Sequence, residues 1–253
     1  MQPDQTTPER DAPKQSSVSP DEIARFGRLA ADWWNPRGPM RPLHDMNPLR
    51  VGWAHARLAP LRNQGPIRLL DLGCGAGLAS EAFARLGYDV LGVDASAEAI
   101  AAARVHAALE PDALQARGGR LEYRAASAEE LVAEGRQFDA ITALEVIEHV
   151  TDPAAFLALL ASLLRPGGII VLSTLNRTWQ SLATAKIGAE YVLRLLPAGT
   201  HDWNRFITPA ELSGLAARAG LRTMDIAGMV PAGLHEWRES RRLGVNYIVA
   251  LAV

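Results

Sequence analysis

The chain has 253 residues, enough for one sizeable α/β domain with its own core. A net charge of −2, with 48% apolar and 21% charged residues, is typical of a soluble globular protein and gives no overall attraction to nucleic acid or anionic lipid. The single cysteine, Cys74, excludes an intrachain disulfide, and no apolar run approaches the roughly 20 residues that cross a bilayer. These features favour a cytoplasmic protein.

Residues 1–18 are predicted to be a disordered tail, because they are rich in Pro, Gln, Thr and Ser and include acidic residues. Ordered structure is expected to begin at residues 19–22, Ser-Pro-Asp-Glu, which form a capping box. The first helix carries apolar residues at helical spacing as far as Trp33 and Trp34, and residues 49–61 predict a second helix. The two tryptophans fit either packing of the first helix onto the core or stacking on an aromatic substrate.

From residue 67 onward, short apolar runs alternate with helical patterns. Strands are predicted at 67–72, 89–94, 121–124, 138–143, 169–174, 221–227 and 247–253, and helices at 80–86, 97–109, 153–164 and 208–220. This alternation predicts a Rossmann-like α/β fold, with a mostly parallel seven-stranded sheet and helices on both faces. Residues 19–253 are expected to form this one domain.

The main functional signal is the sequence DLGCGAG, from Asp71 to Gly77, at the end of the strand predicted at 67–72. Glycines at this point let the backbone approach a ligand closely, at the edge where such sheets bind nucleotides. Asp94 ends the next strand, where a carboxylate can accept both hydroxyls of an adenosine ribose. Together these residues predict a nucleoside-containing ligand, and a tight turn without a ligand is the alternative.

The residues in and beside the glycine loop indicate which nucleoside-containing ligand it binds. A dinucleotide fingerprint, G-x-G-x-x-G, needs Gly or Ala where this chain has Leu78. Asp71 precedes the loop, where its carboxylate would repel a pyrophosphate but tolerate the cationic amino-acid end of S-adenosylmethionine. No Gly-Lys-Ser/Thr follows, which excludes a P-loop. The loop therefore favours S-adenosylmethionine.

The end of the strand predicted at 138–143 carries the candidate catalytic residues. Leu144 is expected to contact the adenine or the methionine chain of the cofactor. If the following residues turn helically, Glu145, Glu148 and His149 share one face. They could hold a divalent cation such as Mg²⁺, or His149, with Glu148 beside it, could act as a general base on a hydroxyl. A third interpretation is that Glu148 and His149 only cap the next helix.

Several motifs resemble those of class I S-adenosylmethionine-dependent methyltransferases, and the more specific ones resemble the UbiG family. The class motifs are Asp71 to Gly77, Asp94 and Leu164-Arg165-Pro166-Gly167-Gly168. The UbiG-like motifs are Trp33-Trp34, Pro42-Leu43-His44, Asn47-Pro48-Leu49-Arg50, residues 173–177, 188–191, 199–202 and 206–212, and Val245-Asn246-Tyr247. The resemblance extends from about Ile23 to the C-terminus.

This resemblance implies O-methylation of phenolic and catechol hydroxyls on polyprenylated ubiquinone precursors, 2-polyprenyl-6-hydroxyphenol and 3-demethylubiquinol. It implies S-adenosylmethionine as methyl donor, with Arg50 at the carboxylate end. The predicted cofactor-binding residues are Arg50, Asp71, Gly73, Gly75, Asp94 and Leu144. Similarity to the eukaryotic relatives at Glu145, Glu148 and His149 implies a divalent metal there. The chain departs from the family at Ala76, where a third consecutive glycine is frequent; alanine adds only a methyl group.

A polyprenylated substrate resides in a bilayer, and residues 175–205 are predicted to be an insertion of the methyltransferase domain that reaches it. Apolar residues from Trp179 to Leu195 recur at helical spacing, with Lys186 and Arg194 between them. This pattern fits a helix in the membrane interface or a lid over the active site. It predicts peripheral contact with an anionic membrane, on its inner face, and other ubiquinone-biosynthesis proteins are further expected partners.

Three other classes of protein share parts of this sequence pattern. A nicotinamide oxidoreductase fails at Leu78, and residues 144–147 replace the Asn-Pro-Pro-Tyr motif of many nucleic-acid methyltransferases, so no nucleic-acid partner is expected. A non-catalytic cofactor-binding protein is opposed by the presence of Glu145, Glu148 and His149 together. Among enzymes, the second candidate activity is methylation of another small phenol or of a carbon centre.

Overall fold

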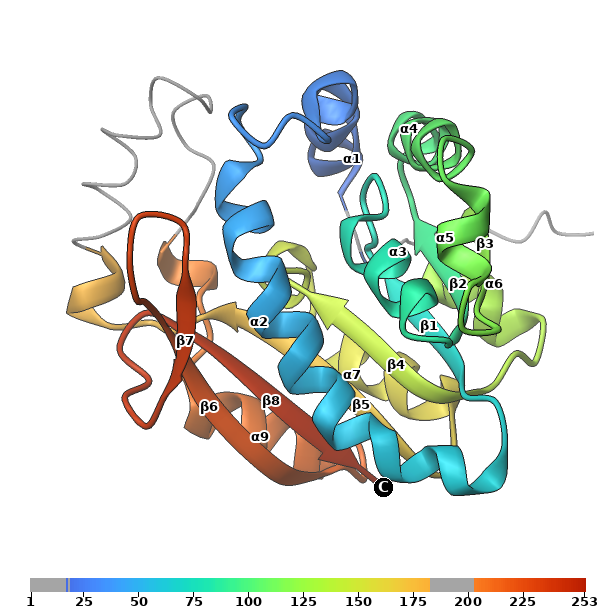
Figure 1. Ribbon diagram of the computed structural model, residues 1–253. Helices are drawn as coiled ribbons and strands as arrows, with labels where there is room; N and C mark the ends of the chain where they lie inside the picture. Colours follow the sequence, from blue (N-terminus) through green and yellow to red (C-terminus); the bar gives the residue numbers. More distant parts are fainter. Residues whose placement is uncertain (1–16, 18, 183–202) are drawn as a thin grey trace, which may run out of the picture.

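The computed structural model describes residues 17, 19–182 and 203–253, and within them eight strands form one sheet in the order β3-β2-β1-β4-β5-β8-β6-β7 (Figure 1). The strands are β1 Arg68–Leu72, β2 Asp89–Asp94, β3 Arg120–Ala125, β4 Phe138–Leu144, β5 Leu164–Leu175, β6 Arg222–Pro231, β7 Trp237–Ser240 and β8 Asn246–Ala252. Strands β1 to β5 pair in parallel, and β6, β7 and β8 are joined by antiparallel pairing. The predicted Rossmann-like, mostly parallel sheet is confirmed.

The sheet has one strand more than the seven predicted. The additional strand, β7, forms a hairpin with the end of β6, where Pro231 is paired with Trp237 and Gly228 with Ser240. Its sequence, WRES, has one apolar residue and no apolar–polar alternation, so the periodicity that marks the other strands is absent. The sequence therefore predicted seven of the eight strands and missed β7, at the edge of the sheet.

The helices are α1 Pro20–Leu29, α2 Arg41–Leu58, α3 Leu78–Arg85, α4 Ala97–Ala107, α5 Pro111–Gln115, α6 Ala128–Ala133, α7 Pro153–Leu163 and α9 Pro209–Arg218, with short 3₁₀ turns η1 Ala30–Asp32, η2 Ala59–Gln64, η3 Ile147–His149 and η4 Trp203–Arg205. The sequence predicted α3, α4, α7 and α9 to within a few residues. It missed α5 and α6, although Ser127 and Glu130 form a capping box at the start of α6. Helix α2 begins at Arg41, eight residues before its predicted start, and continues through Pro48.

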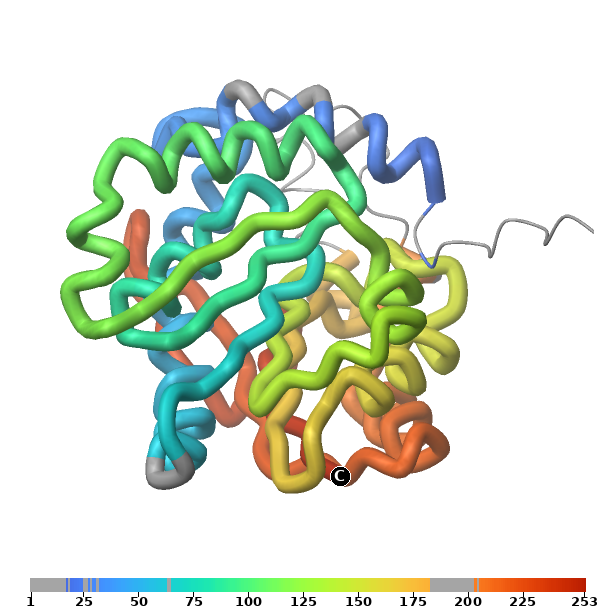
Figure 2. The backbone as a smooth tube through the Cα atoms, turned by 90° about the vertical axis from the view of Figure 1, so that its right-hand side faces the viewer, coloured from blue at the N-terminus to red at the C-terminus, as the bar shows by residue number. Residues whose placement is uncertain are grey.

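Two hydrophobic layers cover the sheet because alternate strand residues point to opposite faces. Leu70 and Leu72 of β1 pack in a cluster with residues of α6, α7 and α9, whereas Leu69 packs in a second cluster with residues of α2 and α3. Figure 2 shows the molecule turned by 90°, with the strands of the amino-terminal half running side by side. All parallel strands thus end at one edge of the sheet, where the glycine loop begins.

Two predicted segments fall largely outside the described residues. Of the tail predicted at 1–18, only Ser17 is described, and its carbonyl accepts hydrogen bonds from the backbone N–H and the hydroxyl of Thr151. Of the insertion predicted at 175–205, residues 183–202 are not described, including Lys186, Ile187, Tyr191 and Arg194. Within the described ranges, no helix combines the length and apolar character needed to cross a membrane.

Candidate active site

The glycine loop follows β1 and takes a conformation that requires glycine. Gly73 and Gly75 have φ of 69° and 55°, in the left-handed region that other residues rarely adopt. A Cβ on Gly73 would lie 2.5 Å from Cγ2 of Val146, and one on Gly75 would collide with the ring of Trp33. The loop is therefore packed between the end of β4 and the N-terminal segment, with its backbone close to both.

Asp71, in β1, supports the glycine loop that follows this strand. Its carboxylate accepts hydrogen bonds from the hydroxyls of Ser80, at 2.5 Å, and Thr142, at 2.7 Å, which joins β1 to α3 and β4. Burial raises the pKa of Asp71, while the two hydroxyl hydrogen bonds and the charge of Arg50 lower it. Through these two hydrogen bonds Asp71 supports the loop, and the cofactor contact that the sequence predicts for it stays a prediction.

Asp94 ends β2 beside the loop, as predicted. One carboxylate oxygen accepts the backbone N–H of Gly75 at 2.9 Å, and the other accepts that of Ser96 at 2.9 Å. Burial raises the pKa of Asp94, and the backbone hydrogen bonds from Ser96, Gly75 and Ala95 oppose this effect. The carboxylate therefore lies between the glycine loop and the start of α4, at the carboxyl edge of the sheet.

Arg50 projects from α2 and is buried, with 3% exposure. Its Nη2 donates to the carbonyl of Leu43 at 3.2 Å, and Nη1 lies 4.0 Å from a carboxylate oxygen of Glu145. Burial lowers the pKa of Arg50, while Glu145, Asp71 and Glu148 raise it. Its Nε has no hydrogen-bond partner among the described residues. A buried guanidinium with an unused donor suits an anionic ligand group.

Glu145 follows Leu144, the last residue of β4, in an unusual backbone conformation. Among the described residues it is the only non-glycine residue with positive φ, 57°. Its N–H donates to the carbonyl of Ser173, and its side chain accepts the hydroxyl of the same residue at 2.7 Å. Such strain persists only where surrounding contacts hold it, and it is frequent at active sites. Here β5 supplies those contacts.

Glu148 is buried at 3% exposure and accepts the hydroxyl of Thr174 at 2.8 Å. Burial and the nearby Glu145 raise its pKa to about 7, against the opposing effect of His149. At neutral pH this carboxyl group therefore exchanges a proton readily. A perturbed carboxyl beside a histidine, at the ligand-binding edge of the sheet, is typical of an acid–base site.

His149 ends the 3₁₀ turn η3 and is surrounded by acidic groups. Its Nδ1 lies 3.4 Å from a carboxylate oxygen of Glu22 in α1. Burial lowers the pKa of His149, but hydrogen bonding to Glu22 and the charges of Glu148, Glu22 and Glu145 outweigh it, so the pKa is raised. The imidazole is thus a stronger base than an isolated histidine.

The metal interpretation of Glu145, Glu148 and His149 gains no support from this geometry. Only residues 147–149 turn helically, so Glu145, with φ of 57°, does not share their helical face as the spacing suggested. Glu145, Glu148 and His149 each face a protein partner: Ser173, Thr174 and Glu22, respectively. Among the described residues no group of three or more His, Cys, Asp and Glu is arranged to hold a metal ion. In this arrangement the residues present do not fit a metal ion.

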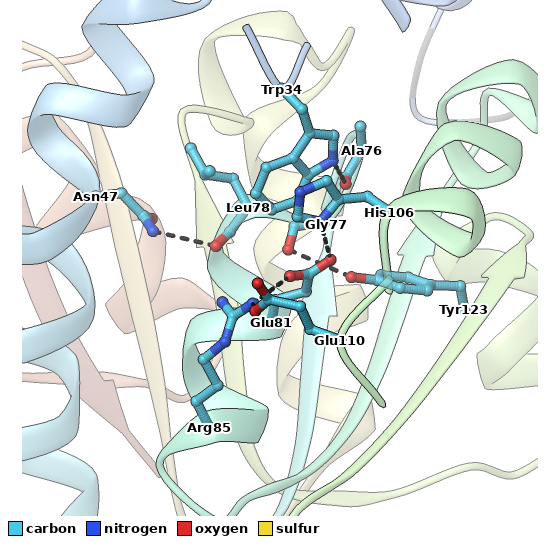
Figure 3. A network of polar contacts seen from close by, with 10 residues as sticks. All are labelled: Trp34, Asn47, Ala76, Gly77, Leu78, Glu81, Arg85, His106, Glu110 and Tyr123. Carbon is cyan, nitrogen blue, oxygen red and sulfur yellow. Dashed lines mark hydrogen bonds and ion pairs between the residues drawn. The ribbon is translucent and has the colours of Figure 1, made fainter. Parts of the chain in front are cut away.

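Trp33 and Trp34 pack against the glycine loop, consistent with the packing interpretation. Trp33 is buried against Gly75, and the indole N–H of Trp34 donates to the carbonyl of Ala76 at 2.9 Å. Trp34 also stacks on His106, with ring centroids 3.3 Å apart (Figure 3). The N-terminal segment thereby covers the outer side of the loop.

Figure 3 shows that this stack continues into a polar network around the buried Glu81. His106 Nδ1 lies 2.7 Å from one carboxylate oxygen of Glu81, and Arg85 donates to the other at 2.9 Å. Glu81 is fully buried, and Arg85 is also 3.4 Å from Glu110. The network anchors α3 to α4 and supports the ring on which Trp34 rests.

The residues that the sequence did not reveal are the hydroxyl partners and Glu22. Ser80, Thr142, Ser173 and Thr174 each hold a predicted site carboxylate, but isolated hydroxyls in strands and helices carry no local signal. Their position could be inferred only from the register that pairs β4 with β1 and β5. Glu22 was interpreted as part of a capping box, and Ser19 does accept its backbone N–H.

Comparison with known proteins identifies the family of the chain. A family model described as a methyltransferase domain matches residues 47–225. A ubiquinone biosynthesis O-methyltransferase from Cereibacter sphaeroides is 46% identical over 93% of this chain and 96% of its own length, and one from Parvibaculum lavamentivorans is 46% identical over 94% and 95%. Magnesium protoporphyrin IX methyltransferase from Synechocystis PCC 6803, solved with bound SAH, has a TM-score of 0.65 at 22% identity and covers 91% of this chain and 98% of its own; that likeness concerns the fold.

The parallel sheet, the glycine loop and Asp94 define a class I, S-adenosylmethionine-dependent methyltransferase. Within that class, the chain belongs to the ubiquinone biosynthesis O-methyltransferase family, which confirms the UbiG resemblance found in its motifs. The enzyme acts on a small molecule.

The pKa of Glu148 predicts an unusual pH dependence of stability. Between about pH 4.5 and 7 the group is protonated in the folded chain and ionised in the unfolded chain, so the stability it contributes is lost as pH rises through 7. The glutamine of Glu148→Gln does not titrate, so this variant escapes that loss. The difference between its free energy of unfolding and that of wild type should therefore increase from pH 5 to pH 8. The increase is at most roughly 3 kcal/mol, since one pKa unit corresponds to about 1.4 kcal/mol. Urea denaturation at several pH values measures this difference.

Glu134→Gln serves as a control of opposite sign. The hydrogen bond from Arg124 lowers the pKa of Glu134, so that variant should lose stability relative to wild type as pH rises through the acidic range. A difference for Glu148→Gln that stays constant with pH would show that Glu148 is ionised throughout in the folded chain.

Proposed function

We propose that this chain transfers the methyl group of S-adenosylmethionine to a phenolic hydroxyl of a polyprenylated ubiquinone precursor. The observation that carries the proposal is 46% identity, over nearly the whole chain, to proteins named ubiquinone biosynthesis O-methyltransferase. The proposed acceptors are 2-polyprenyl-6-hydroxyphenol and 3-demethylubiquinol. The acid–base pair Glu148 and His149, beside the glycine loop, supports transfer to a group that must lose a proton.

The cofactor is held by residues from three elements in this proposal. Arg50 binds its carboxylate through the unused Nε donor, and Asp94 accepts the ribose hydroxyls. The backbone at Gly73 and Gly75 approaches the cofactor closely, and Leu144 contacts its apolar part. S-adenosylmethionine supplies a methyl group on a sulfonium, a good leaving group, so the protein's task is alignment of the acceptor and removal of its proton.

His149 is the proposed general base. Its imidazole, whose Nδ1 lies 3.4 Å from a carboxylate oxygen of Glu22, accepts the proton of the phenolic hydroxyl in this proposal. The oxygen then bonds to the methyl carbon as the carbon–sulfur bond breaks, and the proton remains on the imidazole until solvent takes it. Glu148 lies next to the imidazole and stabilises its protonated form by charge.

The direct test uses purified enzyme, labelled S-adenosylmethionine and a short-chain prenylated catechol, with added Mg²⁺ or with EDTA. Transfer of label that is indifferent to EDTA is the expected result and supports His149 as base. Transfer that EDTA abolishes and Mg²⁺ restores would reinstate a metal at Glu145, Glu148 and His149 and overturn the base. Measurable cofactor binding without transfer would mean that the acceptor is another small molecule.

Peripheral contact with the cytoplasmic face of an anionic membrane is the second part of the proposal. Trp179 is 80% exposed, and its ring lies 6.0 Å from that of Trp203, so two aromatic side chains flank the segment 183–202. An exposed tryptophan such as Trp179 favours the headgroup region of a bilayer, where a polyprenylated acceptor is reached. The same segment could serve as a lid, and the following test separates the two.

Trp179→Ala should lower binding to vesicles containing phosphatidylglycerol by several-fold, because one interfacial aromatic anchor is lost. Co-sedimentation with such vesicles, and with neutral phosphatidylcholine vesicles, measures the effect. Leu234→Ala is the matched control, since Leu234 is 88% exposed but belongs to the β6–β7 hairpin. Equal sedimentation of wild type and Trp179→Ala would leave this segment as a lid only.

A further inference from the structure

Two residues of α2 carry buried polar atoms without a partner. Asn47 and Arg50 lie three positions apart, so their side chains leave the helix on the same face. Asn47 is 9% exposed and Arg50 is 3% exposed. Among the described residues, Oδ1 of Asn47 and Nε of Arg50 have no hydrogen-bond partner. One atom is an acceptor and the other a donor, so together they suit a ligand that carries both kinds of group.

The orientation of the Asn47 amide is fixed by the backbone at the end of the glycine loop. Its Nδ2 donates to the carbonyl of Leu78, the first residue of α3, at 3.1 Å. Figure 3 shows Asn47 reaching this carbonyl from the side of α2. Because a carbonyl can only accept, the amide nitrogen must face Leu78, and Oδ1 is the atom left for another group. A buried acceptor without a donor destabilises the chain, and a bound donor would offset this loss.

The charges around Arg50 favour a ligand that brings its own cation. Glu145, Asp71 and Glu148 all act on this guanidinium. A ligand with only a carboxylate would add a further negative charge to these acidic surroundings. A zwitterionic amino acid adds no net charge, and its ammonium group supplies the donor that Oδ1 of Asn47 lacks. The methionine end of S-adenosylmethionine has this composition.

We propose that Asn47 recognises the ammonium group of S-adenosylmethionine. Its Oδ1 accepts a hydrogen bond from that group, while Nε of Arg50 donates to the carboxylate of the same methionine end. The inference rests on the proposed function at its cofactor site and does not depend on the acceptor. Recognition of both charged groups by one helix separates the whole cofactor from fragments that lack either group.

The segment before Asn47 limits access to the two unpartnered atoms. The carbonyl of Leu43 accepts Nη2 of Arg50, and Leu43 packs in one cluster with Met40 and with Ala76 of the glycine loop. Because both unpartnered atoms are buried, the methionine end reaches them only with a local shift of this segment. Cofactor binding and the position of residues 40–43 are therefore linked.

The test measures the binding of three ligands by isothermal titration calorimetry, without methyl transfer. They are S-adenosylhomocysteine, its deaminated analogue, in which hydrogen replaces the ammonium group, and its decarboxylated analogue. Wild type should bind S-adenosylhomocysteine about 10- to 100-fold more tightly than the deaminated analogue, because the analogue lacks a hydrogen bond from a charged group. Asn47→Leu should abolish this preference: S-adenosylhomocysteine binds more weakly by a similar factor, and the affinity for the deaminated analogue stays within about twofold of wild type.

Two matched variants separate recognition from a structural role. Arg50→Gln should weaken binding of both ligands that carry the carboxylate and spare the decarboxylated analogue. Asn176 is a second buried asparagine whose Nδ2 donates to a backbone carbonyl, that of Leu243, and whose Oδ1 has no partner among the described residues. Asn176→Leu removes a comparable hydrogen bond and should keep the wild-type preference for S-adenosylhomocysteine.

Equal losses of affinity for S-adenosylhomocysteine and its deaminated analogue in Asn47→Leu would show that Asn47 only joins α2 to α3, and would overturn the inference. A wild-type protein that binds the two ligands equally would also overturn it. If Asn47→Leu does not fold, Asn47→Asp decides, because its negative charge should raise the preference for the ligand with the ammonium group above that of wild type. An unchanged or smaller preference refutes the role of Asn47. A wild-type protein that binds no S-adenosylhomocysteine would instead refute the proposed function, on which the inference rests.

Discussion

His149→Gln is expected to lower kcat for methyl transfer by about 10³-fold at pH 7, within the 10²–10⁴-fold range of general base catalysis. Without the base, only acceptor molecules that ionise unaided react, and a phenol with a pKa near 10 is ionised to about one part in a thousand at pH 7. The affinity for S-adenosylmethionine should change little, because His149 is not among the residues proposed to bind the cofactor. Initial rates with saturating cofactor and prenylated catechol measure the effect.

The pH dependence of the same variant gives a second result. Its rate should rise about tenfold per pH unit up to the pKa of the phenol, whereas the wild-type rate levels off once His149 is deprotonated. His235→Gln is the matched control. His235 is an exposed histidine that faces Asp45, and it is not among the residues proposed for the site. A His149→Gln enzyme with the wild-type rate would show that another group, or a metal, removes the proton.

The glycine loop, Asp94 and the order of strands and helices could be predicted from the sequence because their signals are local. Apolar periodicity marks each strand, and the glycines at 73 and 75 adopt the positive φ that their identity suggests. The hydroxyls of Ser80 and Thr142 could not be assigned, because they meet Asp71 only through the pairing of distant segments. Local patterns thus reveal the backbone of the site better than its supporting side chains.

The segment after β4 shows where spacing misleads. The positions of Glu145, Glu148 and His149 suggested one helical face, but the chain leaves β4 with Glu145 in the left-handed region and turns only at Ile147. Helical spacing has meaning only inside a helix, so the spacing gives no support to a metal site here, and only the resemblance to the eukaryotic relatives implies one. Conversely, Glu22 had a sufficient local explanation in the capping box, and that explanation concealed its contact with His149.

Four polar side chains of the site each contact a polar side chain of a neighbouring element. Asp71, Glu145 and Glu148 are each held by a hydroxyl on a neighbouring element, and His149 by a carboxylate on α1. Strand β5 holds both Glu145 and Glu148, α3 and β4 hold Asp71, and α1 brings a carboxylate to His149, so four segments support these side chains. Catalytic groups that must align within a fraction of an ångström require such support.

Asp94→Ala is expected to weaken binding of S-adenosylhomocysteine by at least about 100-fold. A carboxylate accepting two ribose hydroxyls makes two hydrogen bonds to a charged group, each contributing about 1.5–3 kcal/mol, and each 1.4 kcal/mol is about tenfold in affinity. The alanine also removes the acceptor of the Gly75 N–H, which holds the loop in its ligand-binding conformation. Isothermal titration calorimetry of the purified variant measures the change.

Two further variants show whether the loss of affinity comes from the carboxylate of Asp94. Asp94→Asn keeps one oxygen for Gly75 or Ser96 and should bind with intermediate affinity, whereas Asp89→Ala, at the opposite end of β2, should bind as wild type. Thermal unfolding without ligand reports the contribution of Asp94 to the loop alone. If Asp94→Ala binds as tightly as wild type, the ribose is recognised elsewhere. If its affinity falls only in step with its stability, Asp94 supports the loop without contacting the cofactor.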